Sequence, residues 1–115
     1  MAEHVYDSSD SCTGKNAVQE PLEYSIYSLL KKYQITITTA ESATGGMIAS
    51  TLINVPGISE FFTEGYVTYS NEAKVKMIHV SPETIDTYGV VSSETAADMA
   101  ASAAKTAQTM AAVSV

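Results

Sequence analysis

This 115-residue chain has little of what several classes of protein require. It has no tryptophan, a single cysteine (Cys12), and only six lysine and arginine residues against thirteen acidic ones, for a net charge of −7. A single cysteine excludes an internal disulfide and a cysteine-based metal site. A few scattered basic residues on an acidic chain do not form the clusters that a nucleic-acid backbone requires. We therefore expect a cytoplasmic protein with no nucleic-acid partner.

Long apolar runs are also missing. None approaches the ~20 residues that cross a bilayer, so we expect no membrane partner. The first 19 residues are acidic and rich in serine, without the apolar core of a secretory signal. Because they cannot bury enough apolar surface to offset the entropy of ordering, we expect residues 1–19 to form a flexible acidic tail. Residues 20–115 are enough for one domain.

Helical and strand patterns alternate along residues 20–115. Apolar residues recur on one helical face between Leu22 and Tyr33, and residues 35–39 alternate as a half-buried strand does. Capping residues predict later helices after Ser70, Ser81 and Ser92, with strands at residues 65–69 and from residue 111 onward. This alternation predicts an α/β fold whose sheet carries helices on both faces.

The turn between the first strand and the next helix is rich in hydroxyl groups and glycine. It runs from Thr38 through Glu41 and Ser42 to Thr44, Gly45 and Gly46. A helix that begins there presents unpaired backbone N–H groups and partial positive charge, which can hold a phosphate or a carboxylate. The alternative is a purely structural turn whose glycines allow close packing. Composition alone leaves both interpretations open.

Several motifs, in order and at matching separations, resemble the CinA C-terminal domain family. They are Thr-Ala-Glu-Ser-Ala-Thr-Gly-Gly (39–46), Val-Pro-Gly-Ile-Ser (55–59), Gly-Tyr-Val-Thr-Tyr-Ser-Asn-Glu-Ala-Lys (65–74) and Gly-Val-Val-Ser-Ser-Glu (89–94). The resemblance implies a three-layer α/β/α sandwich with a mixed sheet. It also implies a nicotinamide-nucleotide amidohydrolase (NMN deamidase), which hydrolyses the carboxamide of nicotinamide mononucleotide to nicotinate mononucleotide and ammonia.

The same resemblance implies roles for individual residues in a Ser/Lys mechanism. Ser59 is the implied nucleophile and Lys74 the implied base, while Ser42 and Tyr69 support them. The implied substrate-binding residues are Thr44, Gly45 and Gly46. No cofactor or metal is expected; the partners are a small-molecule nucleotide and further copies of the chain. The sequence also supports the role of Lys74 independently of the resemblance. A lysine acts as a base near neutral pH only when its pKa is lowered, and burial or a position near a helix N-terminus would lower it.

Active members of the family continue beyond the position of Val115 into a glycine-rich segment that supplies further substrate contacts. We therefore expect residues 20–115 to be the N-terminal part of such a domain, incomplete at its C-terminus, and the 115-residue chain to show no turnover. The main alternative is a non-catalytic remnant that serves as a nucleotide-binding or protein-interaction module. A Ser-His hydrolase that uses His79 is a third possibility, although no acidic residue is recognisably placed to orient this histidine.

Overall fold

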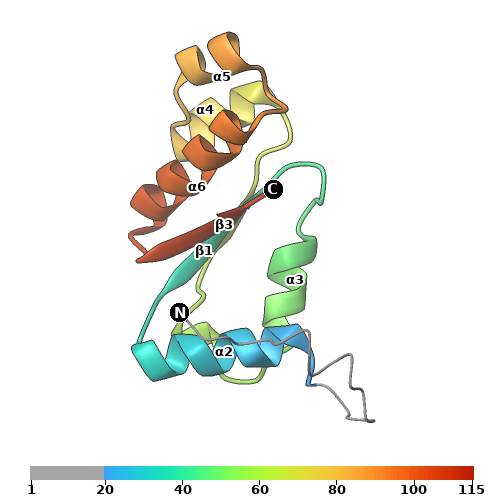
Figure 1. Ribbon diagram of the computed structural model, residues 1–115, viewed down its shortest axis with the longest axis vertical. Coiled ribbons are helices and arrows are strands. Elements are labelled where there is room, and N and C mark those ends of the chain that lie inside the picture. The colour runs from blue at the N-terminus through green and yellow to red at the C-terminus, as the bar shows by residue number, and fades with distance from the viewer. Residues whose placement is uncertain (1–19) are drawn as a thin grey trace.

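A computed structural model describes residues 20–115 of the chain (Figure 1). The predicted tail, residues 1–19, lies outside the described residues. In chain order, the elements are α2 (Leu22–Tyr33), β1 (Ile37–Glu41), α3 (Met47–Ile53), the 3-10 turn η1 (Ile58–Glu60), β2 (Gly65–Val67), α4 (Asn71–Ile78), α5 (Pro82–Tyr88), α6 (Ser93–Ala107) and β3 (Ala111–Ser114).

The three strands of the described residues form one parallel sheet with the order β2-β1-β3. Thr39 pairs with Gly65 on one side of β1, and Ile37 pairs with Ala111 on the other. The prediction of an α/β fold is confirmed. The mixed sheet is not found in residues 20–115, because each connection between strands returns through helices to the same end of the sheet. Successive strands therefore run in the same direction.

Side-chain alternation along β1 divides the core into two clusters. Ile37 faces a cluster built with α2, α3 and η1, whereas Ala40 faces a cluster built with α4 and α6. Figure 1 shows α2 and α3 on one side of β1, and α4 and α6 on the other. The first cluster contains Leu30, Ile37, Leu52, Val55, Ile58, Phe61 and Phe62, and the second Ala40, Ile78, Val80, Met99 and Ala103.

The strand order explains why both faces are covered. The chain moves from β1 to one neighbour, β2, and then returns past β1 to β3 on the opposite side. Since crossovers between parallel strands are right-handed, two moves in opposite directions place their helices on opposite faces. Such a reversal leaves a crevice at the carboxyl ends of β1 and β3, which is where open α/β sheets bind ligands.

Local signals in the sequence set most of the element boundaries. The Ser70 hydroxyl accepts a hydrogen bond from the Ala73 N–H (3.0 Å), and the Ser92 hydroxyl accepts one from the Thr95 N–H (3.1 Å), as helix caps do. The first strand begins two residues later than predicted. Ile35 donates its N–H to the carbonyl of Leu30 and so belongs to the turn that ends α2.

Gly65 lets β2 approach β1 closely. A Cβ atom at this position would lie 2.3 Å from Thr39 Oγ1 and 3.2 Å from Phe62 Cζ. A larger residue there requires the Thr39 and Phe62 side chains to move aside. The absence of a side chain at Gly65 therefore eases the close approach of β2 to β1.

Candidate active site at the carboxyl ends of the strands

A hollow of about 460 Å³ lies at the carboxyl ends of β1 and β3, the crevice that the strand order predicts. It brings together residues from the turn after β1, the segment between β2 and α4, and the start of α6. Its lining consists of Ser42, Ala43, Tyr69, Asn71, Lys74, Val90, Val91, Ser92, Ala96, Met99 and Val115. Three of the four predicted catalytic residues, Ser42, Tyr69 and Lys74, are among them.

Lys74 is the most unusual side chain in this hollow, because only 1% of its surface is exposed. α4 carries the lysine toward the sheet, where its Nζ atom meets three oxygen atoms. Nζ lies 2.8 Å from the carbonyl oxygen of Thr68, 3.3 Å from that of Tyr69 and 3.2 Å from the Ser42 hydroxyl. Burial lowers the pKa of Lys74 below its ordinary value of 10.5.

These three contacts fit both protonation states of the amine. Carbonyl oxygens only accept hydrogen bonds, so Nζ must donate to Thr68 and Tyr69. In the charged form, the third N–H donates to the Ser42 hydroxyl oxygen. In the neutral form, which burial favours, the two remaining N–H groups stay on the carbonyls and the lone pair faces the Ser42 hydroxyl. The arrangement therefore places an amine that can act as a base beside a serine hydroxyl.

Ser42 and Tyr69 contribute to the hollow in different ways. The Ser42 N–H donates to the carbonyl of Val115 (2.9 Å), which holds the serine backbone against the end of β3. Tyr69 gives Lys74 its backbone carbonyl, while its side chain is 77% exposed at the rim of the hollow. The phenol thus faces solvent and is free to meet a ligand.

The glycine-rich turn binds a carboxylate of the chain itself. The Glu41 carboxylate accepts hydrogen bonds from the Thr44 hydroxyl (2.7 Å) and the Gly46 N–H (3.1 Å). The Gly45 N–H donates to the carbonyl of Ser42 (3.1 Å). The anion expected at this helix start is therefore Glu41, and the substrate-binding roles of Thr44, Gly45 and Gly46 stay a prediction.

Glu41 is not among the residues that the sequence predicts to be functional. Its signal is an acidic residue at the last position of a strand, directly before a turn that opens a helix. A carboxylate in that position can turn back onto the helix N–H groups and need not face solvent. The two carbonyl groups on Lys74 carry no sequence signal, because every residue has one.

Ser59, the predicted nucleophile, lies at the other end of β1. It is an exposed residue of η1, between Ile58 and Phe61 of the first core cluster. The Phe61 carbonyl accepts the N–H of Ile37, the first residue of β1. Ser42 follows Ile37 by five residues, or about 16 Å of extended chain. Within the described chain, Ser59 and Lys74 are not brought together, and the role of Ser59 stays a prediction.

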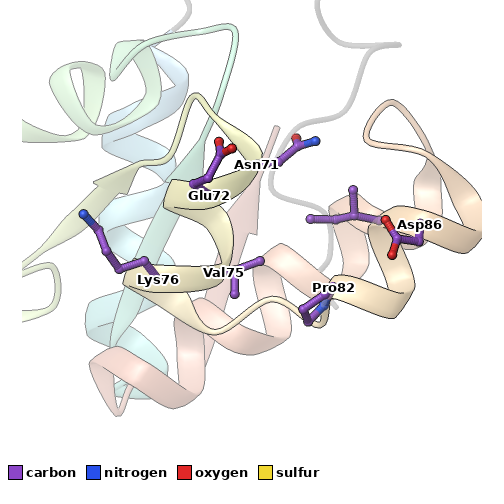
Figure 2. A pocket seen from close by; sticks show the side chains of 7 residues that line it. Asn71, Glu72, Val75, Lys76, Pro82 and Asp86 are labelled. Carbon is purple, nitrogen blue, oxygen red and sulfur yellow. The ribbon is translucent and has the colours of Figure 1, made fainter.

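The remaining candidate groups lie outside this hollow. His79 caps the C-terminus of α4, with its Nδ1 atom 3.4 Å from the Thr106 hydroxyl, and it lines a different hollow from that of Ser42. A second hollow, of about 390 Å³, opens between α4 and α5, where Glu72 and Asp86 stand at its edges (Figure 2). Within residues 20–115, no cluster of histidine, cysteine and acidic residues could hold a metal ion. No helix in this part of the chain is long and apolar enough to cross a membrane.

Comparison with known proteins assigns the fold to a family. The family model described as "CinA C-terminal domain" matches residues 19–115. The chain belongs to the CinA C-terminal domain family. The predicted resemblance is thereby confirmed for the family.

Two solved structures of CinA-type proteins share this fold. A competence or damage-inducible protein from Enterobacter asburiae is 35% identical, with a TM-score of 0.77, over 81% of this chain and 58% of that one. A competence/damage inducible protein, CihA, from Agrobacterium tumefaciens is 39% identical, with a TM-score of 0.73, over 81% and 56%. Among curated relatives, the CinA-like protein of Kosmotoga olearia is 52% identical over 91 residues, which are 79% of this chain and 22% of that protein. The chain thus spans about a fifth of the length of such relatives.

Proposed function

We propose that this CinA-family chain carries the site of an amidohydrolase that acts on the carboxamide of nicotinamide mononucleotide. The observation that carries the proposal is the buried Lys74 amine, fixed by two carbonyl oxygens and directed at the Ser42 hydroxyl. A serine becomes a nucleophile when an adjacent base takes its proton, and a lysine of lowered pKa is such a base. The substrate comes from the resemblance stated above.

The reaction follows the geometry of the pair. The Ser42 oxygen attacks the carboxamide carbon while Nζ of Lys74 accepts the hydroxyl proton. Lys74 then returns this proton to the departing nitrogen, the C–N bond breaks, and ammonia leaves an acyl ester on the serine. A water molecule, activated by the same amine, attacks the ester, giving the carboxylate product and free Ser42.

Ser42 is the hydroxyl that one chain offers to Lys74, whereas the resemblance assigns the nucleophile to Ser59. At the opposite end of β1, Ser59 could reach a Lys74 amine only from a second copy of the chain. The predicted homo-oligomer would supply that copy. Mixing Ser59→Ala chains with Lys74→Met chains tests this arrangement, since labelling of Ser59 by a serine-reactive probe would then require the Lys74 amine of the other copy.

A fluorophosphonate probe tests the pair without requiring turnover. The activated serine oxygen displaces fluoride from phosphorus, and the label is located by mass spectrometry of peptides. We expect labelling at Ser42 that is lost in Ser42→Ala and in Lys74→Met and kept in Ser59→Ala. Labelling at Ser59, or labelling that survives Lys74→Met, would contradict the proposed pair.

The substrate is tested by protection. Nicotinamide mononucleotide should slow the labelling of Ser42 in a concentration-dependent way, and more strongly than free nicotinamide does, because the nucleotide offers additional contacts. Ammonia release from the same nucleotide is measured in parallel. Labelling that nicotinamide mononucleotide leaves unchanged would remove this substrate and favour the alternative of a non-catalytic module.

A further inference from the structure

Glu41 is a buried carboxylate that the proposed chemistry does not use. None of its surface is exposed, and four donors surround it. Besides Thr44 and Gly46, the backbone N–H groups of Ile48 (3.0 Å) and Ala49 (2.9 Å) donate to its oxygen atoms. Burial would raise the pKa of Glu41, but the hydrogen bonds from Thr44, Ala49, Ile48 and Gly46 outweigh burial and lower it. Hydrogen bonds from the same chain therefore stabilise the negative charge of the Glu41 carboxylate.

The backbone of Glu41 is fixed as firmly as its side chain. Its carbonyl accepts the N–H of Thr68 (2.8 Å), and the next residue, Ser42, donates its N–H to Val115 (2.9 Å). Alternation directs the Glu41 side chain to the face that carries α3, while the Ser42 side chain meets Lys74 on the other face. Glu41 thus joins the end of β2 to α3, and Ser42 adds the bond to the end of β3.

The side-chain contacts of Glu41 close the turn that carries Ser42. The turn begins after Glu41 and ends at Gly46, whose N–H donates a hydrogen bond to the Glu41 carboxylate. The Thr44 hydroxyl binds the same carboxylate oxygen from the middle of the turn. Without this carboxylate, the turn would keep two internal backbone bonds, from Gly45 to Ser42 and from Met47 to Thr44. The second of these reaches the first residue of α3, but neither ties the turn or α3 back to Glu41 at the end of β1.

We propose that Glu41 is the positioning residue of the Ser42–Lys74 pair: its carboxylate ties the turn to α3 and so holds the Ser42 hydroxyl at the Lys74 amine. This inference rests on the proposed function, because it assigns Glu41 a role in the same site. The Glu41 carboxylate is hydrogen-bonded on the α3 face and, among the described residues, forms no ion pair with Lys74. Burial is the cause that lowers the pKa of Lys74.

The test compares Glu41→Gln with Glu72→Gln in the 115-residue chain, using the fluorophosphonate probe. Glutamine keeps the size of the side chain but turns an amide N–H₂ toward backbone N–H groups that need an acceptor. Glu72 is the matched control, since it is an exposed carboxylate in the first turn of α4. Rate constants are expressed per folded molecule, with the folded fraction measured by circular dichroism.

We expect labelling of Ser42 to fall by roughly tenfold to a hundredfold in Glu41→Gln, because a displacement of about 1 Å can have that effect. Glu72→Gln should label at the wild-type rate. A Glu41→Gln chain that is less stable but labels at the wild-type rate per folded molecule would overturn the proposal. If Glu41→Gln does not fold, Thr44→Val removes a single contact and should give a smaller fall of the same kind; an unchanged rate in Thr44→Val would overturn the proposal.

A second readout separates this inference from the proposed function. A nuclear Overhauser effect between the Lys74 Cε protons and the Ser42 Cβ protons reports their proximity whether or not the probe reacts. If wild-type chains are not labelled, the proposed function fails, and this signal alone decides the role of Glu41. Loss of the signal in Glu41→Gln, with its retention in Glu72→Gln, supports the positioning role, and retention in both excludes it.

Discussion

The two ends of β1 are built on opposite principles. At the amino end, Ile37 packs with Leu30, Phe61 and other apolar side chains, and the polar Ser59 is left outside in solvent. At the carboxyl end, the chain buries Glu41 and Lys74 and gives each of them hydrogen-bond partners. Apolar packing supplies stability, whereas burial of charged groups carries a desolvation cost. The difference indicates that the amino end contributes stability, whereas the carboxyl end buries the charged groups on which the proposed chemistry rests.

The largest expected effect comes from creating a cavity in the apolar cluster at the amino end of β1. Phe61→Ala removes a buried aromatic side chain and should lower the free energy of unfolding by about 3–5 kcal/mol. Denaturant unfolding measures the loss. Ser42 should still be labelled in the fraction that remains folded, because Phe61 does not line the site. A loss of less than about 1 kcal/mol would show that this end is not the stabilising one.

The next largest effect comes from Lys74→Met, which removes the base and keeps the length of the side chain. We expect labelling of Ser42 to fall by at least about a hundredfold, the low end of general-base contributions. The thermal midpoint should not fall, since methionine needs no hydration, although the carbonyls of Thr68 and Tyr69 each lose a donor. Lys76→Met, on the exposed side of α4, is the control. Equal labelling in both variants would exclude Lys74 as the base.

The pH dependence of stability sharpens the comparison, because it should arise at the carboxyl end. The lowered pKa of Glu41 gives stability that is present above its unfolded pKa and is lost as the pH falls through the folded pKa. The lowered pKa of Lys74 acts at alkaline pH. Between the folded pKa and 10.5 the unfolded chain binds more protons, so stability rises with pH.

Urea unfolding across the pH range checks both slopes. Glu41→Gln should flatten the acid slope but leave the parts due to Asp98 and Glu83. For Asp98, burial would raise the pKa, but hydrogen bonds from Ser102, Thr84 and Ser81 outweigh burial and lower it. For Glu83, the hydrogen bond from the Ser81 hydroxyl lowers the pKa. Lys74→Met should flatten the alkaline slope. A wild-type slope that persists in both variants would place the titrating groups elsewhere.

The smallest expected effect is that of Ser59→Ala. Its side chain is exposed and no hydrogen bond from it is found among the described residues, so stability should change by less than about 0.5 kcal/mol. The labelling rate of Ser42 should equal that of the wild-type chain. A large fall in this rate would bring Ser59 back as a participant and point to a site shared between copies.

Features set by neighbouring residues could be predicted from the sequence. The apolar spacing from Leu22 to Tyr33 gives α2, and Ser70 and Ser92 cap their helices as expected. The late start of β1 was missed because apolar alternation at Ile35 looks the same in a strand and in the turn that ends a helix. The parallel sheet could be found only from the long-range pairing of β1 with its two neighbours.

The site was predictable in its parts but not in its arrangement. Ser42 and Lys74 stand 32 residues apart and meet only because β1 and β2 run in parallel and end together. The acceptors of Lys74 are backbone carbonyls, which no sequence pattern distinguishes. Glu41 was overlooked because an isolated acidic residue is usually solvated, and its four donors become visible only when the turn is folded.

The absence of a side chain at Gly65 bears on the proposed Ser42–Lys74 site, although Gly65 does not line it. Gly65 pairs with Thr39 of β1, and three residues later the same segment presents the Thr68 carbonyl to Lys74. A methyl group at Gly65 would meet the Thr39 and Phe62 side chains. If β2 shifts to relieve that contact, the Thr68 carbonyl moves with it and Lys74 loses a hydrogen-bond acceptor. A substitution distant from any ligand could thus disable the chemistry while leaving every reactive side chain intact, so inheritance of Ser42 and Lys74 alone does not guarantee a working site.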